Sequence, residues 1–223
     1  MKEEILGEKY FIMSNRFVVI LIACVAIFLG LVFFAKRDAG APSDSGTATV
    51  TNHVSGAGTT GVTLVEYGDF QCPACGGYYP IVKQVKEKYG DQITFQFRHF
   101  PIVGIHPNAM SAHRAAEAAS RQDKFWEMHD LIYERQSIWT SSKNPGSIFK
   151  DYAEELSLNM EQYNNDLLKA EIGDIIQADV QAGKDLNVTS TPSFFLEGKL
   201  LENPPRDLEG FSTIIDEAIE AKQ

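Results

Sequence analysis

Hydrophobic and polar positions divide the chain into three stretches of different character. Residues 17–35 form a run of 19 residues without a charge. Residues 36–61 are, after a short charged start, almost entirely small and polar. Such a stretch cannot bury a core, so it predicts a flexible linker. From residue 62 onward, apolar residues recur with the periods of strands and helices, which predicts one folded domain over residues 62–223.

Within that domain, the pattern alternates between strand and helix and therefore predicts the α/β class. The first two strands are expected to be parallel, because a strand–helix–strand connection forms a right-handed crossover. The second and third strands are separated by a long helical block, which predicts an inserted helical subdomain. The expected elements are a strand at 62–65, a helix at 78–89, a strand at 93–98, helices within 107–186, a hairpin at 193–196 and 199–201, and a helix at 208–221.

Charge and cysteine content exclude several classes of protein. The net charge is -10 and the pI is about 5.0, and no basic stripe is present, so nucleic-acid binding has no electrostatic basis. Three cysteines are present, two of them in one CxxC motif and the third, Cys24, inside the apolar run. A framework of structural disulfides would therefore consume the CxxC pair.

The CxxC motif, Cys72-Pro73-Ala74-Cys75, stands where the first strand ends and the first helix begins. Free N–H groups and the positive end of the helix dipole stabilise a thiolate there, so Cys72 is expected to titrate below the usual value of about 8.5. Pro73 suits the first helical turn because it has no N–H group. Cys75 lies one turn deeper on the same face. This predicts an exposed attacking thiol at Cys72 and a shielded resolving thiol at Cys75.

Glu66 is a third candidate, six residues before Cys72 in the first strand. A carboxylate beneath the cysteines could accept and return the proton of Cys75, and a pKa raised by burial would be its signature. The competing interpretation is a strand residue that faces solvent.

Three sequence stretches resemble the DsbA-like branch of the thioredoxin superfamily: VEYGDFQCPACGGYYP, FRHFP and VTSTPSFFLEGK. The order of elements agrees, including the helical block inserted before Thr191-Pro192. The resemblance implies a thiol:disulfide oxidoreductase of the thioredoxin fold. It implies that Cys72 is the nucleophile, Cys75 the resolving cysteine and Glu66 the buried acid.

The resemblance also implies that the peptide bond between Thr191 and Pro192 is cis and that this loop faces Cys72. Its backbone groups would bind an extended substrate chain. One position departs from the strongest oxidases of the family, which have Cys-Pro-His-Cys, because Ala74 stands in place of the histidine. A protonated imidazole would stabilise the Cys72 thiolate, so we expect a lowered but not extreme pKa and a less oxidising disulfide.

The apolar run at 17–35 is long enough to span a hydrocarbon core of about 30 Å, and the charged residues after it predict an uncleaved signal anchor. Two alternatives stay open, a cleaved signal peptide and a lipoprotein modified at Cys24 after Leu21-Ile22-Ala23. Met13 is an alternative start to Met1. Charged residues flank the apolar run on both sides and therefore say little about its orientation in the membrane. A disulfide exchanger, however, belongs outside the cytosol. We therefore place residues 1–16 inside the cell and the domain outside it.

The favoured function is an extracytoplasmic oxidase that introduces disulfides into secreted or cell-envelope proteins. Its partners would be extended or unfolded proteins with cysteine thiols and, by resemblance, a membrane-embedded reoxidising protein; we expect a monomer, no cofactor and no metal. A reductase or isomerase stays open within the same class. A zinc-binding module needs about four ligands, and one CxxC with scattered histidines falls short. A redox-inert, membrane-tethered peptide-binding module is the other alternative.

Overall fold

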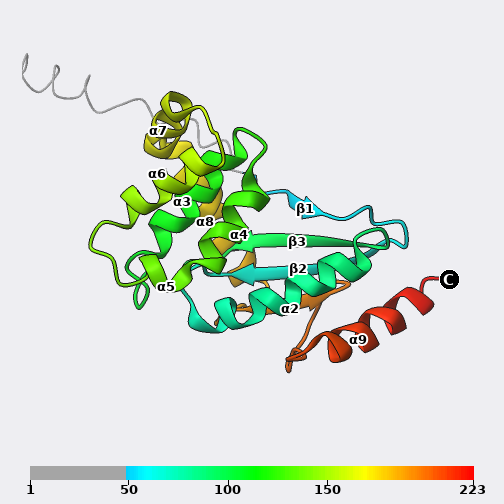
Figure 1. Ribbon diagram of the computed structural model, residues 1–223. Helices are drawn as coiled ribbons and strands as arrows, with labels where there is room; N and C mark the ends of the chain where they lie inside the picture. The colour runs from blue at the N-terminus through cyan, green and yellow to red at the C-terminus, as the bar shows by residue number, and fades with distance from the viewer. Residues whose placement is uncertain (1–48) are drawn as a thin grey trace, which may run out of the picture. The chain divides into compact units, whose positions relative to one another are not determined.

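The computed structural model describes residues 49–223. No helix among these residues is long and apolar enough to cross a membrane. The anchor predicted at residues 17–35, the segment 1–16 and Cys24 lie outside the described residues. Figure 1 shows the described part as a central sheet with helices on both faces and a helical block at one end.

The sheet has five strands in the order β1-β3-β2-β4-β5. The two central strands, β2 and β3, are parallel, as the crossover predicts, while β1, β4 and β5 pair antiparallel with their neighbours. β2 and β3 have mostly buried side chains because helices cover both sides of them (Figure 1). The strands are β1 (His53–Ser55), β2 (Val62–Gly68), β3 (Ile93–His99), β4 (Ser193–Leu196) and β5 (Lys199–Leu200).

Helices α2 (Pro73–Tyr89) and α9 (Leu208–Glu220) pack on one face of the sheet. The opposite face carries Tyr67, which packs with Phe195 and with Val180 of the block. The block lies between β3 and β4, as predicted, and builds a core of its own around the alanine-rich helix α3. Its helices are α3 (Ala109–Ser120), α4 (Phe125–Glu134), α5 (Gln136–Trp139), α6 (Pro145–Glu155), α7 (Met160–Leu168) and α8 (Ala170–Asp185).

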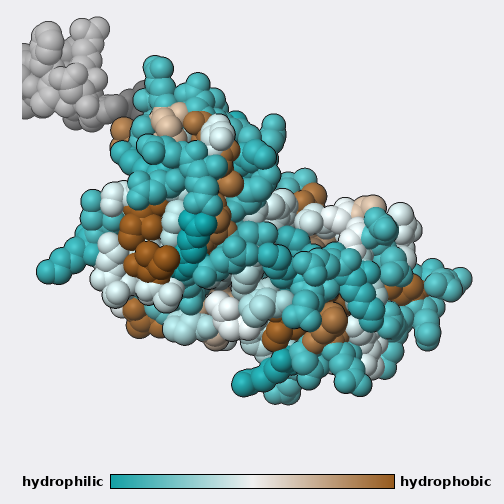
Figure 2. Space-filling view, in the orientation of Figure 1, coloured by the Kyte–Doolittle hydropathy of each residue, from teal (hydrophilic) through white to brown (hydrophobic). Residues whose placement is uncertain are grey.

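The surface of the described part is largely hydrophilic in the view of Figure 2, with hydrophobic groups gathered over part of the helical block. This agrees with the acidic composition.

The predicted linker is wrong at its C-terminal end, because the fold begins well before Val62. β1 adds an antiparallel edge strand to the sheet, with His53 opposite Phe97. Thr51 is buried, and the side chain of His53, which the sequence pattern assigned to a solvated linker, is only 13% exposed. Small polar residues can join a fold when distant partners satisfy them, and composition does not reveal those partners.

The main anchor of this segment is Asp179 of α8, which is fully buried. Its carboxylate accepts hydrogen bonds from the backbone N–H and the hydroxyl of Thr51 and from the backbone N–H of His99, and it pairs with Arg98 at 3.0 Å. One side chain therefore joins the N-terminal segment, the end of β3 and α8.

We expect Asp179→Ala to lower the free energy of unfolding by about 3–5 kcal/mol, because it leaves Arg98 and two backbone donors without their acceptor. Urea unfolding of the two proteins measures the loss. Asp185→Ala, at an exposed position of the same helix, is the matched control and is expected to change stability by less than about 0.5 kcal/mol. Equal losses in both variants would contradict this role of Asp179.

Candidate active site

The end of β2 delivers the CxxC motif to the start of α2, as the sequence predicts. Cys72 is the N-cap residue of α2, and Pro73 occupies its first turn. The loop between strand and helix is held by Asp69, whose carbonyl oxygen accepts from the Cys72 N–H at 3.0 Å and whose carboxylate accepts from the Gln71 N–H at 2.8 Å. The position of Cys72 therefore follows from a tight turn after Gly68 and from a proline that starts a helix.

The two thiols differ in burial in the predicted order, but Cys72 is less exposed than expected. Cys72 is 8% exposed and Cys75 is fully buried, and both are free thiols. Cys72 is covered by the loop before β4, where its thiol donates a hydrogen bond to the carbonyl oxygen of Thr191 at 3.3 Å. A substrate can thus reach only one of the two sulfur atoms, and only along a narrow approach.

The pKa of Cys72 is lowered to about 5. The largest cause is a hydrogen bond from the Cys75 thiol. Burial opposes it and raises the pKa, while the side chain of Thr191 and the backbone N–H groups of Cys75 and Ala74 at the helix start lower it further. These hydrogen bonds stabilise the Cys72 thiolate, to which a histidine at position 74 would also contribute. The sequence prediction of a lowered pKa agrees with this value.

The Cys75 thiol has the opposite environment. Burial is the main cause that raises its pKa well above the usual value, and the neighbouring Cys72 and Glu66 raise it further. The backbone N–H of Asp69 donates to the Cys75 sulfur at 3.5 Å and lowers the pKa slightly. At neutral pH the pair therefore consists of one thiolate and one thiol.

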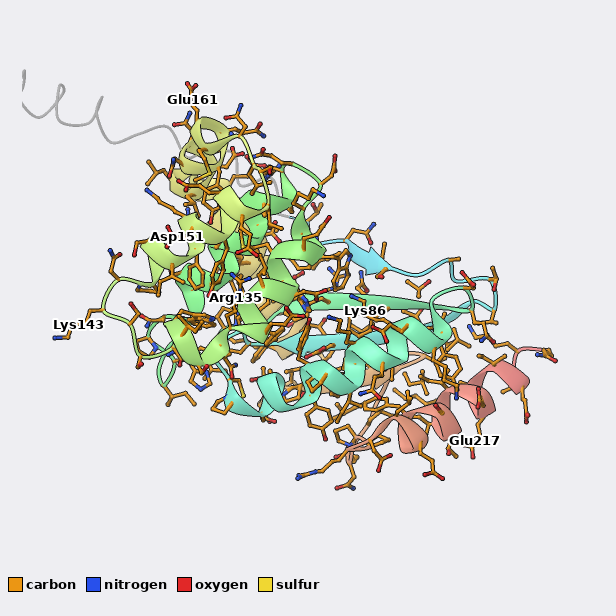
Figure 3. The ribbon with its side chains drawn as sticks, viewed as in Figure 1. Lys86, Arg135, Lys143, Asp151, Glu161 and Glu217 are labelled. Atoms are coloured by element: carbon orange, nitrogen blue, oxygen red, sulfur yellow. The ribbon has the colours of Figure 1, made fainter. Side chains whose placement is uncertain are left out.

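Glu66 is buried rather than facing solvent, with 3% of its surface exposed. Burial raises its pKa to about 8, and Lys86 opposes that shift. Lys86 extends from α2 (Figure 3), and its ammonium group lies 3.7 Å from the ring centre of Trp126. The raised pKa is the signature expected of a buried acid next to the cysteines.

The Thr191–Pro192 peptide bond is cis, which the resemblance implies. The loop brings the backbone of Thr191 against the Cys72 sulfur and leads directly into β4. The structure thus brings together all five site residues named from the sequence, namely Cys72, Cys75, Glu66, Thr191 and Pro192.

Two further residues, Asp69 and Gln136, hold the CxxC loop in place and were not predicted from the sequence. Gln136 of α5 donates from its amide to the carbonyl oxygens of Phe70 and Cys72 at 2.8 and 2.9 Å. The buried carboxylate of Asp69 contacts His106 at 2.7 Å and accepts from the Ile102 N–H at 2.8 Å. Asp69 next to a CxxC motif was a usable signal, whereas Gln136 is 64 residues from Cys72 in sequence and gave none.

Comparison with known proteins shows the family to which the domain belongs. A family model described as Thioredoxin matches residues 48–217. The chain belongs to the thioredoxin family. The match begins before Val62, which agrees with the early start of the fold. The thioredoxin-family domain has the fold of solved DsbA-type proteins, and its helical block is inserted before the hairpin.

Solved structures share this fold. A thioredoxin-like oxidoreductase from Silicibacter pomeroyi is 25% identical, with a TM-score of 0.65 over 81% of this chain and 99% of that chain. BdbD from Bacillus subtilis is 21% identical, with a TM-score of 0.66 over 78% of this chain and 97% of that chain. α-DsbA1 from Wolbachia pipientis is 19% identical, with a TM-score of 0.65 over 77% of this chain and 92% of that chain.

Curated relatives include proteins named Na(+)/H(+) antiporter NhaA. One from Salinispora tropica is 35% identical over 74% of this chain and 24% of its own length, and one from Salinispora arenicola is 37% identical over 66% of this chain and 22% of its own length. The thioredoxin-family domain thus spans about a quarter of these relatives.

The environment of Cys72 predicts a thiol that titrates near pH 5. Ultraviolet absorbance of the reduced protein should show one thiolate appearing with a midpoint near that value, and the rate of alkylation at Cys72 should follow the same curve. Cys72→Ser is the control that removes the transition. A midpoint at or above the free-cysteine value of about 8.5 would contradict the geometry described.

Proposed function

We propose that this protein is a thiol:disulfide oxidase that forms disulfide bonds in proteins outside the cytosol. The observation that carries the proposal is the contrast between the two thiols, a stabilised thiolate at Cys72 and a buried thiol at Cys75. A stabilised thiolate favours the reduced form of the pair and so makes the disulfide a better oxidant. At pH 7, a pKa of about 5 favours ionisation of Cys72 by roughly 3 kcal/mol, which corresponds to about 60 mV for a two-electron couple.

The reaction follows from the same contrast. A substrate thiolate attacks Cys72 in the disulfide, the Cys72–Cys75 bond breaks, and Cys75 leaves as a thiolate. Glu66, protonated at neutral pH, supplies the proton that the high pKa of Cys75 demands. A second substrate thiolate attacks the substrate sulfur of the mixed disulfide, and Cys72 leaves as a stable thiolate. Two electrons have moved from the substrate to the protein, and the substrate has gained a disulfide.

The surroundings of Cys72 suit an unfolded polypeptide. Val103 and Ile105, in the loop held by Asp69, and Ile138 of α5 are exposed hydrophobic side chains on the segments that flank the CxxC loop. On the helix side, a groove with a volume of about 270 Å³ is lined by Ala74, Gly77, Tyr78, Ile81 and Arg206. Apolar contacts beside the backbone of Thr191 favour extended chains of varied sequence.

The apolar run at residues 17–35 supports a membrane location with the domain on the extracytoplasmic side, where disulfides persist. The reduced pair must be reoxidised after each turn, and we propose a membrane-embedded protein for that step. Protease added outside intact cells should cut the chain near residues 38–48 and release the domain. Complete protection of the chain would contradict this location.

A disulfide reductase or isomerase is the second candidate, and Ala74 is the observation that favours it. Without an imidazole at this position the Cys72 thiolate is less stabilised than in the strongest oxidases. The reduction potential of the Cys72–Cys75 pair is thereby shifted toward the lower values that are typical of reductases.

The direct test is catalysis with the full chain in detergent. A reduced, unfolded substrate protein of known disulfides is mixed with glutathione disulfide, and disulfide formation is followed with and without the protein. We expect oxidation to accelerate at least about tenfold, with no acceleration by Cys72→Ser. Faster reduction of an oxidised substrate by glutathione than oxidation of a reduced one would favour the reductase. A substrate that binds Cys72→Ser and the wild type equally and is turned over by neither would favour a redox-inert binding module.

A further inference from the structure

A second cluster of chemically capable side chains lies at the edge of the sheet, outside the CxxC site. His53 of β1, His99 at the end of β3 and Glu117 of α3 each offer one ligand atom, and these atoms all lie within 4.8 Å of one another. Figure 1 shows β1 running beside β3. Glu117 is 64 residues from His53 and 18 from His99 in sequence, so the spacing gave no hint of a site.

The three ligand atoms converge on one point. The Nε2 atom of His99 lies 2.6 Å from Oε1 of Glu117, and the Nε2 atom of His53 contacts the same oxygen. Each imidazole thus turns a ring nitrogen toward the carboxylate, and the three donors come from three different elements. A small displacement would let all three bind one ion between them.

The charge of the cluster is unbalanced when both imidazoles are neutral. Glu117 is a carboxylate with 3% of its side chain exposed. No lysine or arginine of the described residues forms an ion pair with it, and the nearby Arg98 pairs with Asp179 instead. A buried carboxylate needs a compensating positive charge, and neutral imidazoles donate hydrogen bonds without supplying one.

The groups around the three ligands would orient them for an ion. The Nδ1 atom of His99 lies 2.6 Å from Nδ1 of His113, and the hydroxyl of Ser120, which donates to the Glu117 carbonyl oxygen at 2.7 Å, lies 3.3 Å from Oε2 of Glu117. The ring of His53 stacks on Phe125, with ring centres 3.4 Å apart. Metal-binding histidines commonly have such a partner on the second ring nitrogen, which fixes the tautomer.

The cluster also has an open side. A surface pocket with a volume of about 290 Å³ borders His53 and offers an entry path and room for a water molecule as a further ligand. Asp123 is an exposed residue of its lining, and its negative charge favours the approach of a cation. The pocket is lined by Asn52, His53, Val54, Ser120, Asp123, Phe125 and Trp126.

We propose that His53, His99 and Glu117 form a binding site for a divalent transition-metal ion of the zinc class. Two imidazole nitrogens and one carboxylate oxygen suit zinc or cobalt, which accept three protein ligands and a water in a tetrahedral arrangement. Calcium and magnesium prefer oxygen ligands, so they are not expected to bind here. The ion would join β1, β3 and α3, and this inference does not depend on the proposed oxidase function.

The test measures zinc binding by calorimetry and cobalt binding by visible absorption on the full chain without a polyhistidine tag. The cysteines would also bind zinc, so Cys24→Ser protein with the Cys72–Cys75 pair oxidised to the disulfide is used throughout. We expect one ion per chain, bound at least about tenfold more weakly by His53→Ala and by Glu117→Gln. His106→Gln, which removes a histidine outside the cluster, is the matched control and should bind like the wild type.

Thermal unfolding provides a second readout, because an ion that binds only the folded chain stabilises it. A zinc concentration 100-fold above the dissociation constant should raise the unfolding midpoint by about 5–10 °C, and Glu117→Gln should abolish the shift. Glu117→Gln keeps an oxygen acceptor for both histidines, so the variant is expected to fold. Absence of stoichiometric binding, equal affinity in all variants, or preferential binding of calcium would overturn the proposal.

Discussion

Cys72→Ser is expected to abolish thiol–disulfide exchange, with a loss of at least about a thousandfold in the rate of substrate oxidation. Cys72 carries the sulfur atom that lies under the Thr191 loop, and Cys75 is fully buried and cannot be attacked in its place. The loss should therefore match that of the protein lacking both cysteines. Stopped-flow mixing with a reduced substrate protein measures it.

Cys75→Ser is the informative partner of that variant. The Cys72 thiolate can still attack a disulfide of an oxidised substrate protein and form a mixed disulfide, but the Cys75 thiol that would release it is missing. A covalent complex should accumulate and appear on a non-reducing gel as a band that disappears on reduction. Cys72→Ser should show no such band. If Cys75→Ser trapped no substrate while Cys72→Ser did, the roles of the two cysteines would be reversed.

Glu66→Gln is expected to stabilise the protein above pH 5. In the folded chain the pKa of Glu66 is about 8, whereas an unfolded glutamate titrates near 4.5. Between these values the folded state retains a proton that the unfolded state has lost, so the free energy of unfolding falls as the pH rises. The free energy of unfolding falls by at most about 1.4 kcal/mol per pH unit. Below pH 4.5 the carboxyl is protonated in both states and no longer affects the pH dependence of stability.

Urea unfolding at several pH values tests this prediction. The wild type should lose stability between pH 5 and 8 relative to Glu66→Gln, and the gap should reach about 4 kcal/mol at pH 8. Glu87→Gln, at an exposed position of α2, is the control and should follow the wild type at every pH. Parallel curves for the wild type and Glu66→Gln would show that Glu66 is ionised in the folded chain.

Most of the correct sequence predictions depend on interactions between residues that are close together in the sequence. Asn159 caps α7 by accepting a hydrogen bond from the Gln162 N–H, and Asn187 closes α8 in the left-handed conformation with φ of 61°. The strand, proline and helix around Cys72 likewise depend on neighbours a few residues apart. Asp123 is an exception: an aspartate directly before a helical segment favours an N-cap, but Asp123 adopts the left-handed conformation and Lys124 takes the cap position of α4.

Long-range partners explain what the sequence could not predict. The segment 51–61 is mostly polar, and partners far away in the sequence explain why it joins the fold, among them the carboxylate of Asp179, 128 residues from Thr51. His53 and Glu117 meet for the same reason, and so do Gln136 and the carbonyl oxygen of Cys72. Each of these contacts depends on how the helical block folds back against the sheet, which no local pattern encodes.

The central claim is that the Cys72 thiolate is stabilised enough to make the disulfide oxidising, although Ala74 replaces the histidine of the strongest oxidases. Hydrogen bonds from the Cys75 thiol, the Thr191 side chain and the backbone at the start of α2 lower the pKa of Cys72 to about 5. This value lies between those of thioredoxin, about 7, and DsbA, about 3.5. An intermediate reduction potential should follow.

The decisive measurement is the equilibrium reduction potential of the Cys72–Cys75 pair against glutathione, as a function of pH. We expect a value between about −270 mV for thioredoxin and about −120 mV for DsbA. The potential should fall by about 59 mV per pH unit below pH 5, where reduction takes up two protons, and by about 30 mV above it, where it takes up one. A potential at or below that of thioredoxin, with no change of slope near pH 5, would contradict the account and favour a reductase.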